Sequence, residues 1–305
     1  MHPVLFKLPF FDWPLHTYGV LIVSGFLMAM YVAWREAKRQ NQYVDDVLDF
    51  AFWALLGGMI GARIVFILVN WKQYFVDQPW DTVFGVSVPA VLVVWKGGLV
   101  FYGAALGGFV AFLLYTNARG IYGVEKLRIA DMMIVGLPLA AGMGRLGCVA
   151  AGCCWGDAAW ELDAAGHFHQ TIPLAIQFPK GALAYGSMIN SETGAVRAAM
   201  QAIGATGPLV PIQLIDAIGE VGLFFALLVI RSRKWFHGQV LLSYGLLYPI
   251  WRSTLEIFRG DGERGYVIDG VLSTSQFISL CMASASLIAI IVIRKRAMSQ
   301  LAVTP

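Results

Sequence analysis

Charged residues are scarce in this sequence. They make up 13% of its 305 residues, whereas 58% are hydrophobic and the mean hydropathy is +0.67. Soluble domains carry roughly 25% charged residues, so this scarcity excludes an ordinary soluble fold and indicates a membrane protein with several spans. The net charge is only +3. Basic loop residues account for that excess, so we expect no nucleic-acid partner.

Internal repeats and a cleavable leader are also lacking. The segment before the first apolar run carries Pro9, Asp12 and Pro14. A secretory leader would have a basic start and a small-residue cleavage site, and neither is evident. We therefore expect the first helix to be retained.

Apolar runs long enough to cross a bilayer recur along the chain. A spanning helix needs about 20 apolar residues, because lipid offers no partners to irregular backbone. The candidate spans are residues 17–35, 47–69, 98–118, 129–148, 212–231, 238–258 and 273–293. The sequence thus predicts an all-α integral membrane protein of seven transmembrane helices, as one polytopic domain over residues 1–305.

Clusters of basic residues follow alternate spans. They are Arg35, Lys38 and Arg39; Arg119, Lys126 and Arg128; Arg231, Arg233 and Lys234; and Arg294, Lys295 and Arg296. Because basic loops stay in the cytoplasm, we expect a periplasmic N-terminus and a cytoplasmic C-terminus. Residues 157–211, the longest stretch between spans, then form a small periplasmic head.

Several charged residues lie where the membrane makes charge costly. Arg145 lies near the end of the fourth predicted span, and Arg252, Glu256 and Arg259 are spaced for one face of the sixth helix. One acid does not neutralise three guanidiniums, so we expect them to bind a phosphate. The alternative is a buried ion pair that only fixes helix packing. Arg63 either joins this group or pairs with an acid elsewhere.

Small residues repeat at four-residue spacing in GGMIGAR (57–63) and GGLVFYGAALGG (97–108). Such spacing predicts helices that pack closely. Close approach of a lipid headgroup to Gly97, Gly98 and Gly103 is the alternative interpretation.

An ordered series of motifs resembles the prolipoprotein diacylglyceryl transferase family. GRLGCVAAGCCWG (144–156) resembles the family signature. The other matching motifs, in the family's order, are PLHTYGVLIVSG (14–25), GGMIGARI (57–64), WKGGLVFYGAALGG (95–108), PIQL (211–214) and Y-x3-R-x3-E-x2-R (248–259).

This resemblance implies a multi-pass enzyme of the bacterial inner membrane. Such an enzyme transfers the diacylglyceryl group of phosphatidylglycerol to the lipobox cysteine of a prolipoprotein signal peptide. The products are a thioether and glycerol 1-phosphate. Phosphatidylglycerol, the signal peptide and the bilayer are then the partners, and we expect neither a cofactor nor a metal ion.

The resemblance also implies roles for individual residues. Arg145 matches the signature arginine that binds the headgroup, and Arg252 matches a second essential arginine. Glu256 either orients Arg252 or accepts a proton. The further substrate-binding residues that we expect are Tyr18, Tyr248, Arg259, Gly98 and Gly156. Fixed guanidiniums would stabilise the charge that grows on a departing phosphate.

Three positions depart from the family pattern. Tyr102 occupies a place where the family commonly has histidine; it joins the expected catalytic residues, although tyrosine titrates near 10 and is a poor base. Cys148 and Cys153 stand where the family has asparagine and glutamate. The headgroup contacts must therefore differ in detail.

The cysteines admit several interpretations. Cys148 could form a disulfide with Cys153 or Cys154 in an oxidising compartment. Buried thiols are the default, and a metal site with His167 and His169 would have irregular spacing. Cys281 is expected to pack within the last span.

Other functions compete with lipid transfer. A divergent paralogue would use another acceptor, and a thiol-redox membrane protein would use Cys148, Cys153 and Cys154. An anion transporter would line its path with the arginines, but the charges cluster toward one face.

Overall fold

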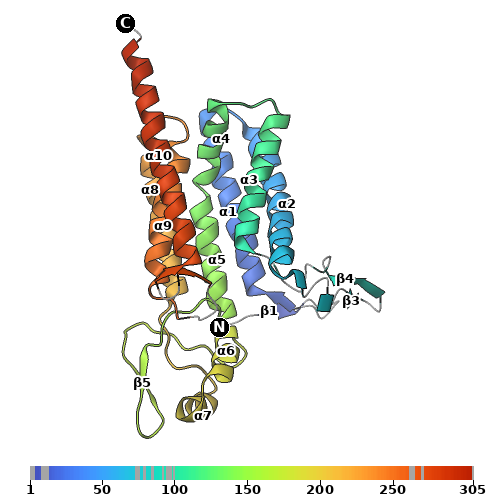
Figure 1. The fold of residues 1–305 in the computed structure, drawn as a ribbon, viewed down its shortest axis with the longest axis vertical. Coiled ribbons are helices and arrows are strands. Elements are labelled where there is room, and N and C mark those ends of the chain that lie inside the picture. Colours follow the sequence, from blue (N-terminus) through green and yellow to red (C-terminus); the bar gives the residue numbers. More distant parts are fainter. Residues whose placement is uncertain are drawn as a thin grey trace. The chain divides into compact units, whose positions relative to one another are not determined.

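The computed structural model describes residues 4–7, 14–72, 76–77, 80–83, 86–90, 93, 98, 100–260, 265–268 and 271–303. These residues form mostly helices (Figure 1). The helices are α1 (Thr17–Gln40), α2 (Val44–Val69), α3 (Phe101–Ala118), α4 (Val124–Ile134), α5 (Leu137–Ala151), α6 (Leu183–Ser191), α7 (Gly194–Ile203), α8 (Ile212–Ser232), α9 (Gln239–Glu256) and α10 (Thr274–Val303).

Short strands pair into antiparallel hairpins between these helices. They are β1 (Val4–Lys7) with β2 (Pro14–His16), β3 (Trp80–Val83) with β4 (Val86–Pro89), β5 (Trp160–Leu162) with β6 (Phe168–Gln170), and β7 (Tyr266–Ile268) with β8 (Leu272–Ser273). The chain forms two compact units, one of Met1–Ala33 with Ala130–Pro305 and the other of Trp34–Ile129.

Within the described residues, five helical segments are long and apolar enough to cross a membrane. They are Thr17–Gln40, Val44–Val69, Val124–Ala151, Ile212–Ser232 and Thr274–Lys295. The apolar part of α3, Tyr102–Ala118, is shorter, and α9 is not among the five because polar and charged residues lower its hydropathy. An all-α integral membrane protein, as the sequence predicts, is confirmed.

The fourth predicted span is divided between α4 and α5. Pro138 lies in the first turn of α5, where a missing amide hydrogen is tolerated, and the preceding turn at 135–136 separates the two helices. Gly136 in that turn lies against α1, since an added Cβ would come within 2.6 Å of the Ala29 carbonyl oxygen. The break therefore lets the backbone of two helices approach closely.

In the unit Trp34–Ile129, α2 and α3 pack through glycines. A Cβ on Gly107 would overlap the Gly57 carbonyl oxygen and lie 3.0 Å from the Gly61 Cα atom. A Cβ on Gly61 would likewise overlap the Gly103 carbonyl oxygen. The predicted close packing of small residues is confirmed for this helix pair.

In the other unit, α8 packs on both α5 and α9, and α9 packs on α10. Val135, Leu227, Val240 and Tyr244 form a buried core between these helices. The start of α9 is held by the buried carboxylate of Asp131, which accepts hydrogen bonds from the Gly238 and Leu241 amides at 2.9 and 3.0 Å. A carboxylate is favourable there because free amides and the helix dipole give a helix start partial positive charge.

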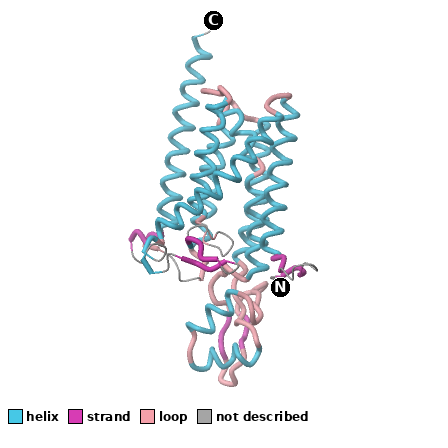
Figure 2. Tube along the Cα trace, turned by 90° about the vertical axis from the view of Figure 1, so that its right-hand side faces the viewer, coloured by secondary structure: helices cyan, strands magenta, loops and turns pink. Residues whose placement is uncertain are grey.

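Residues 157–211, here called the head, form a small lobe at the ends of α5 and α8 (Figures 1 and 2). The head contains the β5–β6 hairpin and helices α6 and α7. Phe178, Ala182, Ala184 and Leu209 make a hydrophobic core at its base. Pairing of Ala158 and Ile176 with Leu209 ties the lobe to the segment that enters α8.

The glycine contacts between α2 and α3 predict opposite effects for two adjacent alanine substitutions. Gly107→Ala forces the helices apart and should lower the free energy of unfolding by about 1–3 kcal/mol. Gly108→Ala places its Cβ 3.9 Å from the Ala54 carbonyl oxygen. It should be neutral or stabilising, since alanine favours a helix over glycine by up to about 1 kcal/mol. Thermal unfolding in detergent measures both variants. Equal melting temperatures for Gly107→Ala and Gly108→Ala would contradict the close packing of α2 on α3.

Candidate active site

Arg145 lies in the last two turns of α5 and is anchored by a carboxylate of α8. Its Nε atom is 2.7 Å from Oδ2 of Asp216. The other oxygen of this carboxylate, Oδ1, accepts a hydrogen bond of 3.1 Å from Nε1 of Trp251 on α9. Asp216 is buried, whereas a quarter of the Arg145 side chain (25%) is exposed. The guanidinium is thus fixed by three helices and still accessible.

A glycine on α8 makes room for this arrangement. A Cβ on Gly219 would overlap the Trp251 ring, so the absence of a side chain lets the indole lie on α8. Its N–H then reaches Asp216, three residues earlier on the same helix. A larger residue at 219 would displace the donor that completes the carboxylate's coordination.

Glu220 is a second buried acid on α8. It lies one turn after Asp216, is 1% exposed, and its Cβ is 3.5 Å from a Cβ built on Gly142 of α5. Within the described residues its Oε2 atom has no hydrogen-bond partner. Two carboxyl groups therefore face α5 near Arg145.

The sequence interpretation missed Asp216 and Glu220. Their signal was available, because acids spaced by four residues within an apolar span face one helix side and are expensive in a membrane. An arginine within a span needs a counter-ion, and the fifth predicted span carries these two acids.

Arg252 and Glu256 pair within α9 as their spacing predicts. The NH2 nitrogen of Arg252 is 2.6 Å from Oε2 of Glu256, and both side chains are largely buried. The prediction that Arg259 continues the same helical face is wrong, because α9 ends at Glu256. Beyond that residue the backbone pairs with the signature segment instead, as Gly156 forms a bridge with Arg259.

Backbone contacts hold the signature loop, residues 152–157. The Asp157 amide donates to the Phe258 carbonyl at 3.1 Å, and the Gly156 amide donates to the Val210 carbonyl at 3.0 Å. Gly260 leaves no room for a side chain, since its Cβ would lie 2.6 Å from the Gly156 carbonyl oxygen. Gly156 and Arg259 are therefore neighbours although about a hundred residues separate them.

Two tyrosines complete this group. Tyr248 remains helical despite Pro249, and its ring stacks on Tyr244 with centroids 5.3 Å apart. It lies within electrostatic range of both Arg145 and Arg252. Tyr18 at the start of α1 lies against Gly147, where a Cβ would come within 2.8 Å of its ring. All the predicted site residues except Gly98 and Tyr102 lie in this unit. Pairwise interactions link Tyr248 to Arg145 and Arg252, Arg252 to Glu256, and Gly156 to Arg259.

Tyr102 and Gly98 belong to the other unit, Trp34–Ile129. Tyr102 is 45% exposed on α3. The Gly98 carbonyl accepts a 3.2 Å hydrogen bond from Arg63, which also donates to the Ala90 and Val93 carbonyls. Gly98 has φ +83°, and a Cβ there would strike Phe66 and Arg63. The neighbouring side chains of Phe66 and Arg63 therefore explain why position 98 is a glycine. Gly97 lies outside the described residues.

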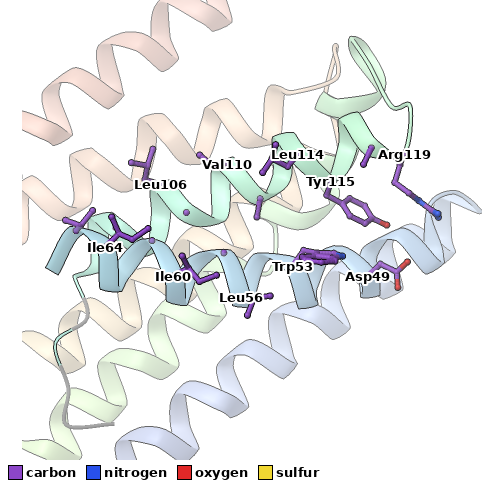
Figure 3. Close-up of a pocket in the computed structure, with 17 residues that line it drawn as sticks. Asp49, Trp53, Leu56, Ile60, Ile64, Leu106, Val110, Leu114, Tyr115 and Arg119 are labelled. Carbon is purple, nitrogen blue, oxygen red and sulfur yellow. The ribbon is translucent and has the colours of Figure 1, made fainter. Parts of the chain in front are cut away.

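The same unit has a groove of about 760 Å³ along α2 and α3 (Figure 3). Its walls are apolar side chains such as Ile60, Leu106 and Val110, and Asp49 and Arg119 lie at one end. Such walls suit hydrocarbon chains better than a phosphate. Gly103, one of the glycines considered for a lipid headgroup, lines this groove, whereas Arg145, Arg252 and Glu256 do not.

All four cysteines are free thiols in the structure. The Sγ atoms of Cys148, Cys153 and Cys154 all lie within 4.8 Å of one another. The expectation that Cys281 packs inside the protein is wrong, because it is exposed on α10. A membrane helix with one face toward lipid can leave a thiol there without a packing partner.

The family to which this chain belongs follows from comparison with known sequences. The sequence model of the prolipoprotein diacylglyceryl transferase family matches residues 3–292. This chain is a member of that family. The match includes all but the last residue of the seventh predicted span, and it includes Arg145, Arg252 and Arg259.

Individual relatives are similar over nearly their full length. Phosphatidylglycerol--prolipoprotein diacylglyceryl transferase of Clostridium tetani is 28% identical over 92% of this chain and 93% of its own. The protein of that name from Clostridioides difficile is 29% identical over 92% and 91%. That of Rhodopirellula baltica is 32% identical over a shorter part, 57% of this chain and 32% of its own.

The Arg145–Asp216 pair predicts a measurable loss of stability when only one charge is removed. Asp216→Asn preserves an acceptor for Trp251 but leaves a mostly buried guanidinium unpaired. We expect the free energy of unfolding to fall by about 3 kcal/mol. The double variant Asp216→Asn/Arg145→Met should recover much of this loss. Denaturant unfolding in detergent measures both, and an additive double variant would show that the pair is not coupled.

Proposed function

We propose that this protein transfers the diacylglyceryl group of phosphatidylglycerol to the lipobox cysteine thiol of prolipoproteins. Family membership over residues 3–292 supports this reaction. The observation that carries it to particular residues is the anchored, accessible guanidinium of Arg145 in the signature segment. Tyr248 lies within electrostatic range of both Arg145 and Arg252, so a phosphate bound beside this tyrosine would meet two guanidiniums.

Pairing with acids does not prevent these arginines from binding phosphate. A guanidinium has five N–H donors, and a single carboxylate engages at most two of them in a bidentate pair. Asp216 binds Arg145 through Nε, and Glu256 binds Arg252 through NH2. Donors therefore remain for phosphate oxygens, while the acids hold each guanidinium in a fixed direction.

The reaction is a displacement at a glycerol carbon. The acceptor thiolate attacks the carbon that bears the phosphate ester, a sulfur–carbon bond forms, and the carbon–oxygen bond breaks. Its electron pair leaves with glycerol 1-phosphate, and the peptide retains a thioether. Arg145 and Arg252 stabilise the charge that develops on this leaving phosphate. Glu256 positions Arg252. The substrate-binding residues are Tyr18, Tyr248 and Arg259. Gly156 keeps the backbone of the signature loop beside Arg259.

The same proposal includes the topology. Seven spans follow when α3 and α9 cross the bilayer with the five more apolar segments. Basic loops then place the N-terminus and the head in the periplasm and the C-terminus in the cytoplasm of a bacterial inner membrane. On the family resemblance we also propose Gly98 for substrate binding and Tyr102 for catalysis.

Lipid transfer by purified protein tests the proposal. The protein in detergent is incubated with phosphatidylglycerol and a lipobox peptide, and mass spectrometry follows the gain of a diacylglyceryl group at cysteine. Arg145→Ala should reduce the rate by about 100-fold or more, as expected when a charge-stabilising donor is lost. Arg197→Ala, on the exposed surface of α7, is the matched control. No transfer to a competent peptide by the unaltered protein would refute the function.

Glu256→Gln separates catalysis from structure. We expect turnover to fall more than the yield of folded protein, because glutamine keeps the size of the side chain but loses the charge that directs Arg252. Size-exclusion yield and transfer rate are compared in the same preparation. An equal loss of both would mean that the ion pair serves only the fold.

A further inference from the structure

The three thiols of the signature segment are held together by backbone geometry. Cys148 lies in the last turn of α5, and the Cys153 amide donates a 3.0 Å hydrogen bond to its carbonyl. Gly152 between them ends α5 in the left-handed region, with φ +70°, and Cys154 has φ +58°. Gln213 donates a 2.7 Å hydrogen bond to the Cys153 carbonyl. The loop is therefore fixed with its sulfur atoms already converged.

The sulfur spacing is that of ligands around one ion. Zinc–thiolate bonds are about 2.3 Å long, so three thiolates around zinc lie about 4 Å apart. The observed sulfurs all lie within 4.8 Å of one another, and shifts below about 1 Å would close the site. Thiolates are the ligands that select zinc and other soft ions.

Two guanidiniums lie near the cluster. Arg145 and Arg259 are within electrostatic range of Cys154, one of the two thiols that line the cavity. Positive charge therefore lies beside one edge of the three sulfurs.

A cavity gives access to these sulfurs. It has a volume of about 760 Å³ and is lined by Cys153, Cys154, Tyr185, Ser187 and Asn190, among others. Cys148 is buried, while the other two thiols are partly exposed. A fourth ligand can therefore approach the cluster from the head.

We propose that Cys148, Cys153 and Cys154 bind Zn²⁺ and leave a fourth coordination position that takes the acceptor's thiol. The second half of this statement rests on the proposed transfer function. Three protein ligands with one open position are the arrangement of catalytic rather than structural zinc.

The chemistry balances without a change of oxidation state. Zinc held by Cys148, Cys153 and Cys154 would promote loss of the acceptor thiol's proton to water, because a metal-bound thiol is deprotonated. The acceptor sulfur would then form its bond to the glycerol carbon as the carbon–oxygen bond of the phosphate ester breaks. The displaced electron pair departs on glycerol 1-phosphate beside Arg145.

Cobalt binding by the purified full-length protein tests the site. Co²⁺ replaces zinc and shows thiolate-to-metal charge-transfer absorption. Fully reduced, metal-free protein should bind one Co²⁺ that Zn²⁺ displaces, and Cys148→Ser, Cys153→Ser and Cys154→Ser should each weaken this absorption. Cys281→Ser is the matched control and should leave it unchanged. The proposal would be overturned if folded, reduced protein lacked the absorption. It would also be overturned if the three signature variants absorbed as strongly as the unaltered protein.

A lipobox peptide tests the open position. It should raise the charge-transfer absorption by about a third, since three thiolates become four, whereas a peptide with serine for cysteine should not. No increase with the cysteine peptide refutes the proposed role of the fourth position. Lipid transfer that persists in metal-free protein overturns the zinc proposal and leaves the transfer function standing. If zinc and the peptide bind but no lipid is transferred, the zinc proposal stands and the transfer function is refuted.

Discussion

The ion pair between Arg145 and Asp216 is the interaction on which the site depends. A guanidinium near the end of a membrane span needs a counter-charge, and Asp216 supplies it from a neighbouring helix at 2.7 Å. Trp251 binds the same carboxylate from a third helix. The position of α8 relative to α5 and α9 is thus coupled to the direction of one arginine. Removing one member of such a pair lowers the stability of the fold more than replacing both members by apolar residues, because it leaves one buried charge unpaired.

The motif order predicted part of what the structure shows. Tyr18, Tyr248, Arg252 and Arg145 lie in one compact unit, in which α8 packs on both α5 and α9. Small residues at four-residue spacing likewise predicted the contact of α2 with α3. These features are local in sequence and follow from helical periodicity.

Other features of the structure depend on contacts between residues that are far apart in the sequence, and helical periodicity does not predict them. Arg259 leaves the helical face because backbone groups 155–157, about a hundred residues earlier, bind the residues after α9. The convergence of three sulfurs requires a left-handed Cys154, a conformation that non-glycine residues rarely adopt. The partners of Arg63 are backbone carbonyls, which carry no sequence signal. Long-range pairing and unusual backbone angles decide these details, and spacing does not encode them.

The low hydropathy of α9 has a consequence for how this protein is made. A segment with Arg252, Glu256 and Pro249 enters hydrocarbon poorly by itself. Its neighbours in the bundle offer what lipid does not: Asp131 receives the amides at its start, and Asp216 receives Trp251 near its end. Both acids precede α9 in the chain and so emerge first from the ribosome. Biogenesis would then proceed by docking α9 onto helices already delivered to the bilayer.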